Sequence, residues 1–413
     1  MIDPVPVYMI IIILALMLGT YRGVYGRADR LVADDRSTFG WPASQPRHHA
    51  RLAAVISGLV GIALYLTGLH FRGSEPSVIW DAGWMTVILI GCLSVTVTSL
   101  KNVKPVFQAR ARVELLAETG LMLLSLAALL TTFGIIGSLL FEASLFFKDV
   151  SAVEFLFGTQ WSPQTAIQAG STGQSGAFGS VPVFLGTFLI ALIAMVVAAP
   201  IGLMVAIYLS EYASSQTRAF AKPAIEVLAG IPTVVYGFFA LITVGPAIRD
   251  FAAWLGAEAA TQSALAAGLV MGVMIIPLVS SLSDDVIRAV PHNLRDASTA
   301  LGATRSETLK RVVLKSAMPG IIGALLLAVS RAIGETMIVV MAAGQAANMT
   351  ANPMEAVTTV TVQIVALLTG DQVFDSPRTL AAFALGLVLF TITLLLNIGA
   401  LAAVNRYRVP NNE

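Results

Sequence analysis

Nine long apolar stretches dominate the sequence and leave few possibilities for its fold. They cover roughly residues 5–21, 52–70, 84–100, 117–141, 181–209, 224–247, 264–282, 319–344 and 380–404. A helix that crosses the hydrocarbon core of a bilayer needs about 20 mainly apolar residues, and each stretch is close to that length. Only 12% of the residues are charged, about half of the share usual in soluble proteins. The sequence therefore predicts an all-α polytopic membrane protein.

The distribution of Lys and Arg predicts how the chain is oriented. If the chain starts outside and crosses nine times, nearly all of its positive charges fall in cytoplasmic segments. Only Arg72, Lys148, Arg249 and Arg378 then lie outside, with Arg331 inside the membrane. This asymmetry follows the positive-inside rule, so we expect a periplasmic N-terminus and a cytoplasmic C-terminus. No cationic segment precedes the first stretch, which favours a retained helix over a cleaved signal peptide.

Several function classes find no support in the sequence. The formal net charge is +1, so the chain has no large excess of positive charge with which to bind nucleic acid. Cys92 is the single cysteine, and the four histidines show no metal-ligand spacing. No G-x-x-x-x-G-K-[S/T] loop is present, and none of the six lysines follows a glycine, so the chain is not expected to bind ATP phosphates by itself. We expect no enzyme, no cofactor and no metal site.

Arg331 and Glu335 lie near the middle of the eighth apolar stretch. A charged side chain at that depth costs about 2.5–3.5 kcal/mol on insertion scales, so their presence needs an explanation. On one continuous helix, a spacing of four residues places both side chains on the same face, where they can form a structural pair. Alternatively, Arg331 provides a positive site for a transported oxyanion, because a guanidinium group matches phosphate oxygens, and Glu335 tunes that site. The residues alone leave both interpretations open.

The segment from about 283 to 318 predicts two cytoplasmic helices joined by a turn. Pro291 suits the first turn of a helix, and Gly302 suits a left-handed helix terminus. Thr304 and Glu307 have the spacing of a capping box, and Pro319 is expected to begin the following span. Such a helical pair either lies on the inner leaflet or fills a groove on a soluble partner.

This segment resembles the cytoplasmic coupling loop of binding-protein-dependent ABC importer permeases. The family signature reads Glu-Ala-Ala, three residues, Gly, nine residues, and then Ile, any residue, Leu and Pro. In "DASTALGATRSETLKRVVLK", Asp296, Ala297 and Ser298 take the first three places and Gly302 takes the glycine. Val312, Leu314 and Lys315 end the motif. Asp thus replaces Glu, Ser replaces Ala, and Lys replaces the final Pro.

Other stretches resemble the Pst-type phosphate permeases. These are "FGSVPVFLGTFLIALIAMVVAAPIGLMVAIYLSEYA", "IEVLAGIPTVVYGFFAL" and "SRAIGETMIVV". "FLFGTQWSP" and "RAIGETM" fit the C-type subunit better than the A-type subunit. The resemblance covers roughly residues 115–408. It implies a six-span permease core at 115–413, preceded by an additional membrane region of three spans at 1–114.

The resemblance also implies a function and a set of partners. The chain is expected to be the permease subunit of an ATP-driven phosphate importer in a bacterial inner membrane. It would pair with a related permease subunit, two ATPase subunits and a periplasmic phosphate-binding protein, in contact with membrane lipid. Arg331 and Glu335 would belong to the substrate pathway. The ATPase-coupling loop would comprise Asp296, Ala297, Ser298, Gly302, Thr304, Glu307 and Leu314.

Three alternatives remain open. The same fold could import another oxyanion such as sulfate or molybdate. The chain could instead be a membrane scaffold or sensor for phosphate signalling, whose extra N-terminal spans recruit a partner. A secondary transporter is disfavoured, because the predicted helical pair at 283–318 would then lack a purpose.

Overall fold

The computed structural model describes residues 5–35, 45–71, 78–101, 108–163, 176–369 and 376–407. Most of these residues are helical, and eight helices are long and apolar enough to cross a membrane. They correspond to the last eight of the nine predicted stretches, which confirms an all-α, multi-span membrane protein. The first predicted stretch forms the start of helix α1 (Val5–Asp35). Contacts divide the chain into an N-terminal unit (Met1–Phe133) and a C-terminal unit (Gly134–Glu413).

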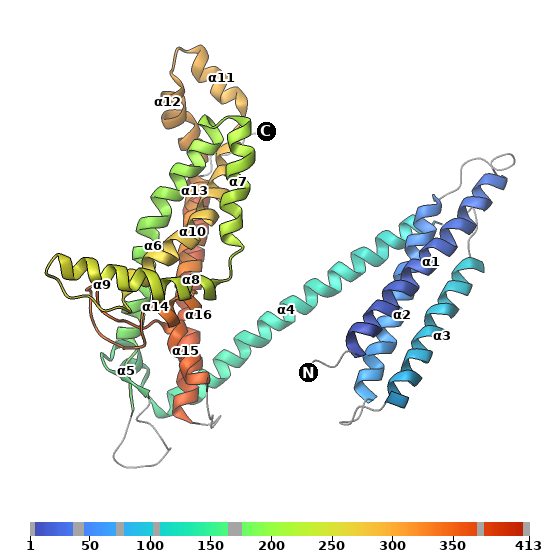
Figure 1. Cartoon of the computed structure of the whole chain (residues 1–413), viewed down its shortest axis with the longest axis horizontal. Helices are drawn as coiled ribbons and strands as arrows, with labels where there is room; N and C mark the ends of the chain where they lie inside the picture. Colours follow the sequence, from blue (N-terminus) through green and yellow to red (C-terminus); the bar gives the residue numbers. More distant parts are fainter. Residues whose placement is uncertain are drawn as a thin grey trace. The chain divides into compact units, whose positions relative to one another are not determined.

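The N-terminal unit is a bundle of three helices (Figure 1). Helices α1, α2 (Pro46–Phe71) and α3 (Val78–Lys101) each pack against the other two. Ile13, Ile88 and Cys92 form its apolar core. Hydrogen bonds also join the three helices, because Thr20 in α1 bonds to Thr96 in α3 at 2.7 Å and Cys92 Sγ donates to the carbonyl of Ser57 in α2. The division between the units lies inside α4 (Ala109–Asp149).

The centre of the C-terminal unit is the contact between α6 (Val181–Ile207) and α10 (Ala264–Arg288), which pack together along most of their length. Small residues let these two helices approach closely. A Cβ atom on Gly268 would lie 2.6 Å from Ile193 Cγ2, and one on Gly272 would lie 2.9 Å from Val197 Cβ. Helix α13 (Leu314–Ile333), α8 (Thr233–Phe239) and α14 (Met337–Ala342) complete this core.

Aromatic residues gather at one end of the C-terminal unit. Phe146 at the end of α4 contacts Phe155 in α5 (Ala152–Phe157) and Phe178 edge to face. A short antiparallel pair of strands, β1 (Trp161–Ser162) and β2 (Ala177–Phe178), lies beside them. Helices α15 (Val360–Leu368) and α16 (Pro377–Tyr407) pack against this cluster.

The opposite end carries the predicted helical pair, α11 (His292–Ala300) and α12 (Arg305–Thr308). Figure 1 shows α11 and α12 at one end of the unit, and α5 and α15 toward the other. Three segments have π-helical hydrogen bonding, a geometry that often accompanies functional sites. These segments are η2 (Tyr208–Tyr212), η3 (Ala240–Val244) and η4 (Leu309–Val313). The remaining α-helices of the unit are α7 (Ser215–Ala229) and α9 (Gly245–Trp254).

The structure corrects two predicted spans. The stretch 224–247 is not one helix, because α7 ends at Ala229 and Pro232 precedes the first residue of α8, where its fixed φ suits a helix start. The stretch 319–344 is not one helix either, because α13 ends at Ile333 and α14 begins at Met337. Pro319 also does not begin its span. It lies inside α13, as a membrane helix tolerates when neighbouring groups satisfy the freed carbonyl.

Candidate transport and coupling sites

Arg331 and Glu335 flank the break between α13 and α14. Arg331 lies in the last turn of α13, Gly334 follows that helix, and Glu335 stands outside both helices. The two side chains therefore do not share one helix face as the sequence predicts. Among the residues that the structure describes, no ion pair joins them. The structural pair that would have explained both charges is absent from this conformation.

Each charge instead lies at a helix end of opposite polarity. A helix has partial positive charge at its N-terminus and partial negative charge at its C-terminus. Glu335 Oε1 accepts a hydrogen bond from the backbone N–H of Met337 at 3.2 Å, at the start of α14. Arg331 lies near the free carbonyls at the end of α13. These placements offset part of the cost of putting charges among apolar residues.

The side chains of Arg331 and Glu335 differ in their exposure to solvent. Glu335 is half-buried, whereas Arg331 is exposed on the surface of this chain. In the part of the chain that the structure describes, Arg331 makes no hydrogen bond or ion pair. Between Lys315 and Glu335 it is also the only charged residue in the sequence. Its guanidinium group is therefore free to bind a ligand or a neighbouring subunit.

Helix α15 fixes the position of the break. Thr361 Oγ1, in the first turn of α15, donates to the backbone carbonyl of Glu335 at 2.8 Å. Thr361 also shares a hydrogen bond of 3.0 Å with Thr359, which caps the same helix. Thr187 in α6 accepts from the backbone N–H of Val360 at 3.0 Å. The backbone between α13 and α14 is thus held by α15, which is itself held by α6.

The second predicted site, the pair α11 and α12, has the local geometry that the sequence predicts. Gly302 has a φ of +86°, a left-handed conformation that favours glycine. Thr304 and Glu307 form the capping box, since Thr304 Oγ1 accepts from the backbone N–H of Glu307 and Glu307 Oε2 accepts from that of Thr304. A hydrogen bond of 2.9 Å between Ser298 and Thr308 joins the two helices. We call α11 and α12 the coupling helices.

The coupling helices have an inner and an outer face. Leu309 and Val313, which continue from α12, are buried against Ala206 and Ile287, with Leu314 packed at the edge of this cluster. Asp296 and Ala297 are exposed on α11. Leu301, in the turn between the two helices, is 90% exposed, so this large apolar side chain is not buried against the rest of the chain. The outer face is therefore suited to bind another protein.

Two contacts that the sequence did not predict tie the coupling helices to η2, at the end of α6. Arg295 Nη2 lies 2.9 Å from Glu211 Oε1, and both side chains are largely buried. Arg295 also donates to the carbonyls of Val290 and Ile287 at the end of α10. The guanidinium carbon of Arg305 lies 5.1 Å from the centre of the Tyr212 ring, a cation–π contact.

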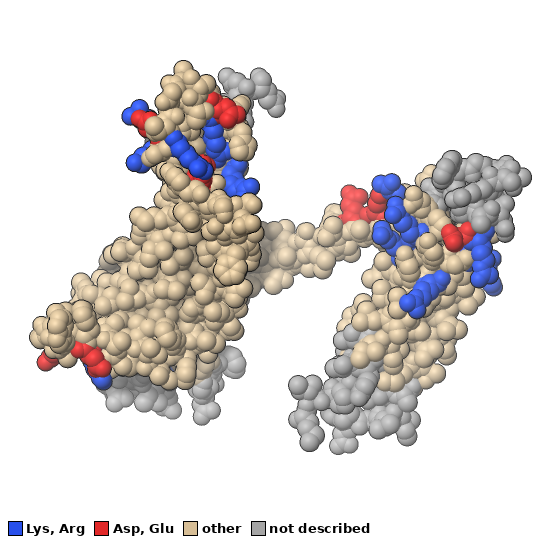
Figure 2. Space-filling model, turned by 45° about the horizontal axis from the view of Figure 1, so that its top comes forward, with Lys and Arg blue, Asp and Glu red and all other residues tan. Residues whose placement is uncertain are grey.

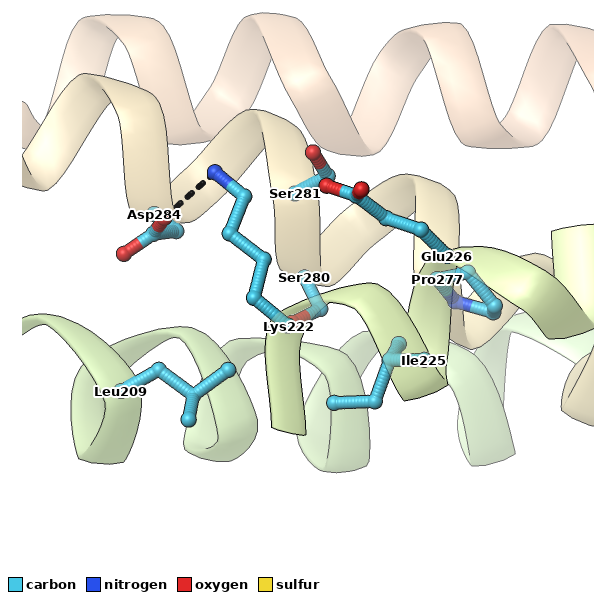
Figure 3. A pocket seen from close by; sticks show the side chains of 8 residues that line it. All are labelled: Leu209, Lys222, Ile225, Glu226, Pro277, Ser280, Ser281 and Asp284. Carbon is cyan, nitrogen blue, oxygen red and sulfur yellow. Dashed lines mark hydrogen bonds and ion pairs between the residues drawn. The ribbon is translucent and has the colours of Figure 1, made fainter. Parts of the chain in front are cut away.

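A buried carboxylate links α7 to α10 near the same end. Asp284 is 1% exposed and accepts two hydrogen bonds from Arg218, at 2.8 and 2.5 Å. Lys222 Nζ lies 3.0 Å from Asp284 Oδ2, and a dashed line marks this contact in Figure 3. The hydrogen bond to Asp284 raises the pKa of Arg218. A sequence signal did exist, because two adjacent acidic residues, Asp284 and Asp285, come soon after the long apolar stretch 264–282.

Charge is distributed unevenly over the surface of the C-terminal unit. On the face shown in Figure 2, charged residues gather at the end that carries the coupling helices and at the opposite end, and the surface between them is uncharged. This pattern fits a unit whose middle lies in the membrane. Among the described residues, no group of three or more His, Cys, Asp or Glu side chains could hold a metal ion.

Comparisons with known proteins agree with this geometry. The family model described as "Binding-protein-dependent transport system inner membrane component" matches residues 198–409, more than half of the chain. The probable ABC transporter permease protein YqgH of Bacillus subtilis (strain 168) is 33% identical over 252 residues, which cover 61% of this chain and 77% of that protein.

Two further relatives come from Mycobacterium tuberculosis (strain ATCC 25618 / H37Rv). The phosphate transport system permease protein PstC 1 is 32% identical over 282 residues, covering 62% of this chain and 83% of that protein. The phosphate transport system permease protein PstA 1 is 36% identical over 159 residues, covering 38% of this chain and 48% of that protein. The resemblance inferred from the motifs is confirmed: the chain belongs to the family of binding-protein-dependent transport system inner membrane components and is a permease subunit of an ABC importer.

Proposed function

We propose that this permease imports inorganic phosphate, and that Arg331 binds the ion on its way across the membrane. The observation that carries the proposal is the state of Arg331, an exposed cation without a partner among the described residues, in a helix that is otherwise apolar from Ser316 to Ile333. The relatives named as phosphate permeases support phosphate as the cargo. A guanidinium group binds phosphate oxygens through two parallel hydrogen bonds.

Glu335 gives the site selectivity and keeps its affinity low. Phosphate at neutral pH carries a proton that can be donated to a carboxylate, whereas sulfate carries none. A carboxylate close to Arg331 therefore favours phosphate over sulfate or molybdate. The negative charge of Glu335 also weakens binding of any anion, and a transport pathway needs sites that release their ion. The hydrogen bonds to Met337 and Thr361 hold Glu335 in place for both roles.

The partners follow from the exposed surfaces. The exposed Arg331 would face a related permease subunit, so that each chain forms half of the pathway. The outer face of the coupling helices, with Asp296, Ala297 and Leu301, would fill a groove on one of two ATPase subunits. This places the coupling helices in the cytoplasm and the α5–α15 end toward the periplasm, where a phosphate-binding protein would dock. The end of α16 would then lie on the cytoplasmic side, as the charge distribution predicts for the C-terminus.

The test is ATP-dependent phosphate uptake by the complete complex in proteoliposomes. We compare the wild-type chain with Arg331→Gln and with Arg249→Gln, whose arginine is exposed and pairs with the neighbouring Asp250. Sulfate is the control cargo. We expect Arg331→Gln to lose phosphate uptake although the complex assembles, and Arg249→Gln to retain it. Normal uptake by Arg331→Gln would overturn the pathway assignment, and sulfate uptake equal to phosphate uptake would overturn the cargo.

A further inference from the structure

A cavity of about 400 Å³ lies beside α15. In Figure 1, α15 lies toward the end of the C-terminal unit that is opposite the coupling helices. Its described lining comes from α14, the segment after it, α15 and the start of α16. The polar members are Gln345, Gln363, Thr369 and Arg378. Arg378 is the only charged residue among the described residues that line it, and it gives this part of the lining a positive charge.

Arg378 has an unsatisfied donor at this cavity. The side chain is half-buried, and its Nε atom is buried without a hydrogen-bond partner. Arg378 makes no hydrogen bond or ion pair with any part of the chain that the structure describes. Buried polar groups in proteins nearly always have partners, and an exception calls for an explanation. The other donors of its guanidinium group, which make no hydrogen bond with the described residues, are suited to bind an anion in the cavity.

The cavity wall also contains a polar side chain whose position is fixed. Gln363 is 3% exposed, and both ends of its amide are held. Trp161 Nε1 donates to Gln363 Oε1 at 2.9 Å, and Gln363 Nε2 donates to Thr358 Oγ1 at 3.0 Å. Gln345 is exposed and contributes a further amide. A fixed wall with one guanidinium group is suited to a small oxyanion, which needs few donors in defined positions.

Helix α15 connects this cavity to the break at Arg331 and Glu335. Its first turn bonds to the carbonyl of Glu335 through Thr361, and its second half lines the cavity through Val365, Ala366 and Leu367. Nine residues of helix span only about 13 Å. Helix α15 therefore contacts both the break that carries Arg331 and Glu335 and the cavity that Arg378 lines.

We propose that the Arg378 cavity is a second phosphate-binding site, which takes up the ion before it reaches Arg331. The proposal rests on the assignment of phosphate as the cargo. The site raises the local concentration of phosphate at the entrance of the pathway. It binds the ion through the Arg378 guanidinium group.

A labelling experiment tests the site without requiring transport. Cys92 is buried and is the only cysteine of the chain, so a cysteine introduced by Gln345→Cys reports on the cavity. We measure its reaction with a small neutral maleimide in the complete complex, in inorganic phosphate and in chloride of equal ionic strength. Phosphate should slow labelling, and should not do so after Arg378→Gln. Met349→Cys, which is exposed and outside the lining, should react equally in both salts. Phosphate-independent labelling of Gln345→Cys would overturn the proposal.

Two further comparisons in the labelling experiment distinguish this site from the Arg331 site and from a site for a lipid headgroup. Protection by phosphate should persist in Arg331→Gln, and its loss there would mean that the cavity is no separate site. The complex is also compared in phosphatidylcholine and phosphatidylglycerol nanodiscs. If protection requires phosphatidylglycerol and not inorganic phosphate, the cavity holds a lipid headgroup and the proposal is wrong.

Uptake kinetics provide a second, independent measurement. Arg378→Gln should raise the half-saturating phosphate concentration roughly tenfold, as expected for loss of a charge-assisted hydrogen bond, and Arg378→Lys should raise it less. An uptake curve for Arg378→Gln that coincides with the wild-type curve would contradict the proposal. If the wild-type complex takes up no phosphate but labelling is still protected, the cargo assignment fails and the anion site stands.

Discussion

Arg295 Nη2 lies 2.9 Å from Glu211 Oε1 and thereby joins the first coupling helix to the end of α6. The same guanidinium group donates to two carbonyls at the end of α10. Since α6 and α10 form the central pair of the C-terminal unit, one side chain connects the coupling helices to the core of the permease. A displacement of α11 by a bound ATPase would pass directly to both helices.

Replacement of Arg295 should therefore uncouple transport from ATP hydrolysis. Arg295→Gln leaves Glu211 largely buried without its ion partner, which costs on the order of 3 kcal/mol for such a pair. We expect the complex to hydrolyse ATP but to import less phosphate per ATP. The measurement is the ratio of imported phosphate to hydrolysed ATP in proteoliposomes. The control is Lys310→Gln, which replaces an exposed residue of η4. An unchanged ratio in Arg295→Gln would contradict the proposed role of Arg295.

Asp284 should be essential for the stability of the C-terminal unit, whereas its neighbour Asp285 should not. Asp284→Asn leaves Arg218 and Lys222 without the buried carboxylate they share, and removing one partner of a buried pair costs about 3–5 kcal/mol. The side chain of Asp285 is 64% exposed and pairs with Lys222, so Asp285→Asn should cost about 0–1 kcal/mol. Thermal unfolding of the purified chain in detergent compares the two variants, and equal unfolding temperatures would refute the prediction.

The glycines of α10 should tolerate no side chain larger than hydrogen without rearrangement. In Gly268→Val the new Cβ would meet Ile193 at 2.6 Å, and overpacking of this kind costs about 1–3 kcal/mol. Gly399→Val is the matched control, because a Cβ there meets nothing within 4 Å. We expect a lower unfolding temperature for Gly268→Val alone. Similar unfolding temperatures would show that α6 and α10 can separate freely.

Local signals made the spans and the coupling helices predictable. The capping box of Thr304 and Glu307 and the turn at Gly302 depend on residues within a few positions, and the structure has both. The break after Ile333 was missed because the sequence around Gly334 continues the apolar pattern, while the backbone is held by Thr361, 26 residues further on. The ion pairs of Asp284 and Arg295 were missed because their partners are 66 and 84 residues away in the sequence.

Glu335 should determine which oxyanion the Arg331 site prefers. Its carboxylate can accept a hydrogen bond from a protonated phosphate and repels sulfate, which has no proton to donate. Glu335→Gln removes the repulsion, so sulfate binding should rise relative to phosphate binding. Equilibrium binding of radiolabelled phosphate and sulfate is measured on the complex without its binding protein, so that the ratio reports on the permease alone. Glu258→Gln, which is exposed, should leave the ratio unchanged. An unchanged ratio in Glu335→Gln would mean that Glu335 does not select the anion and that its carboxylate only caps α14, by accepting from the backbone N–H of Met337.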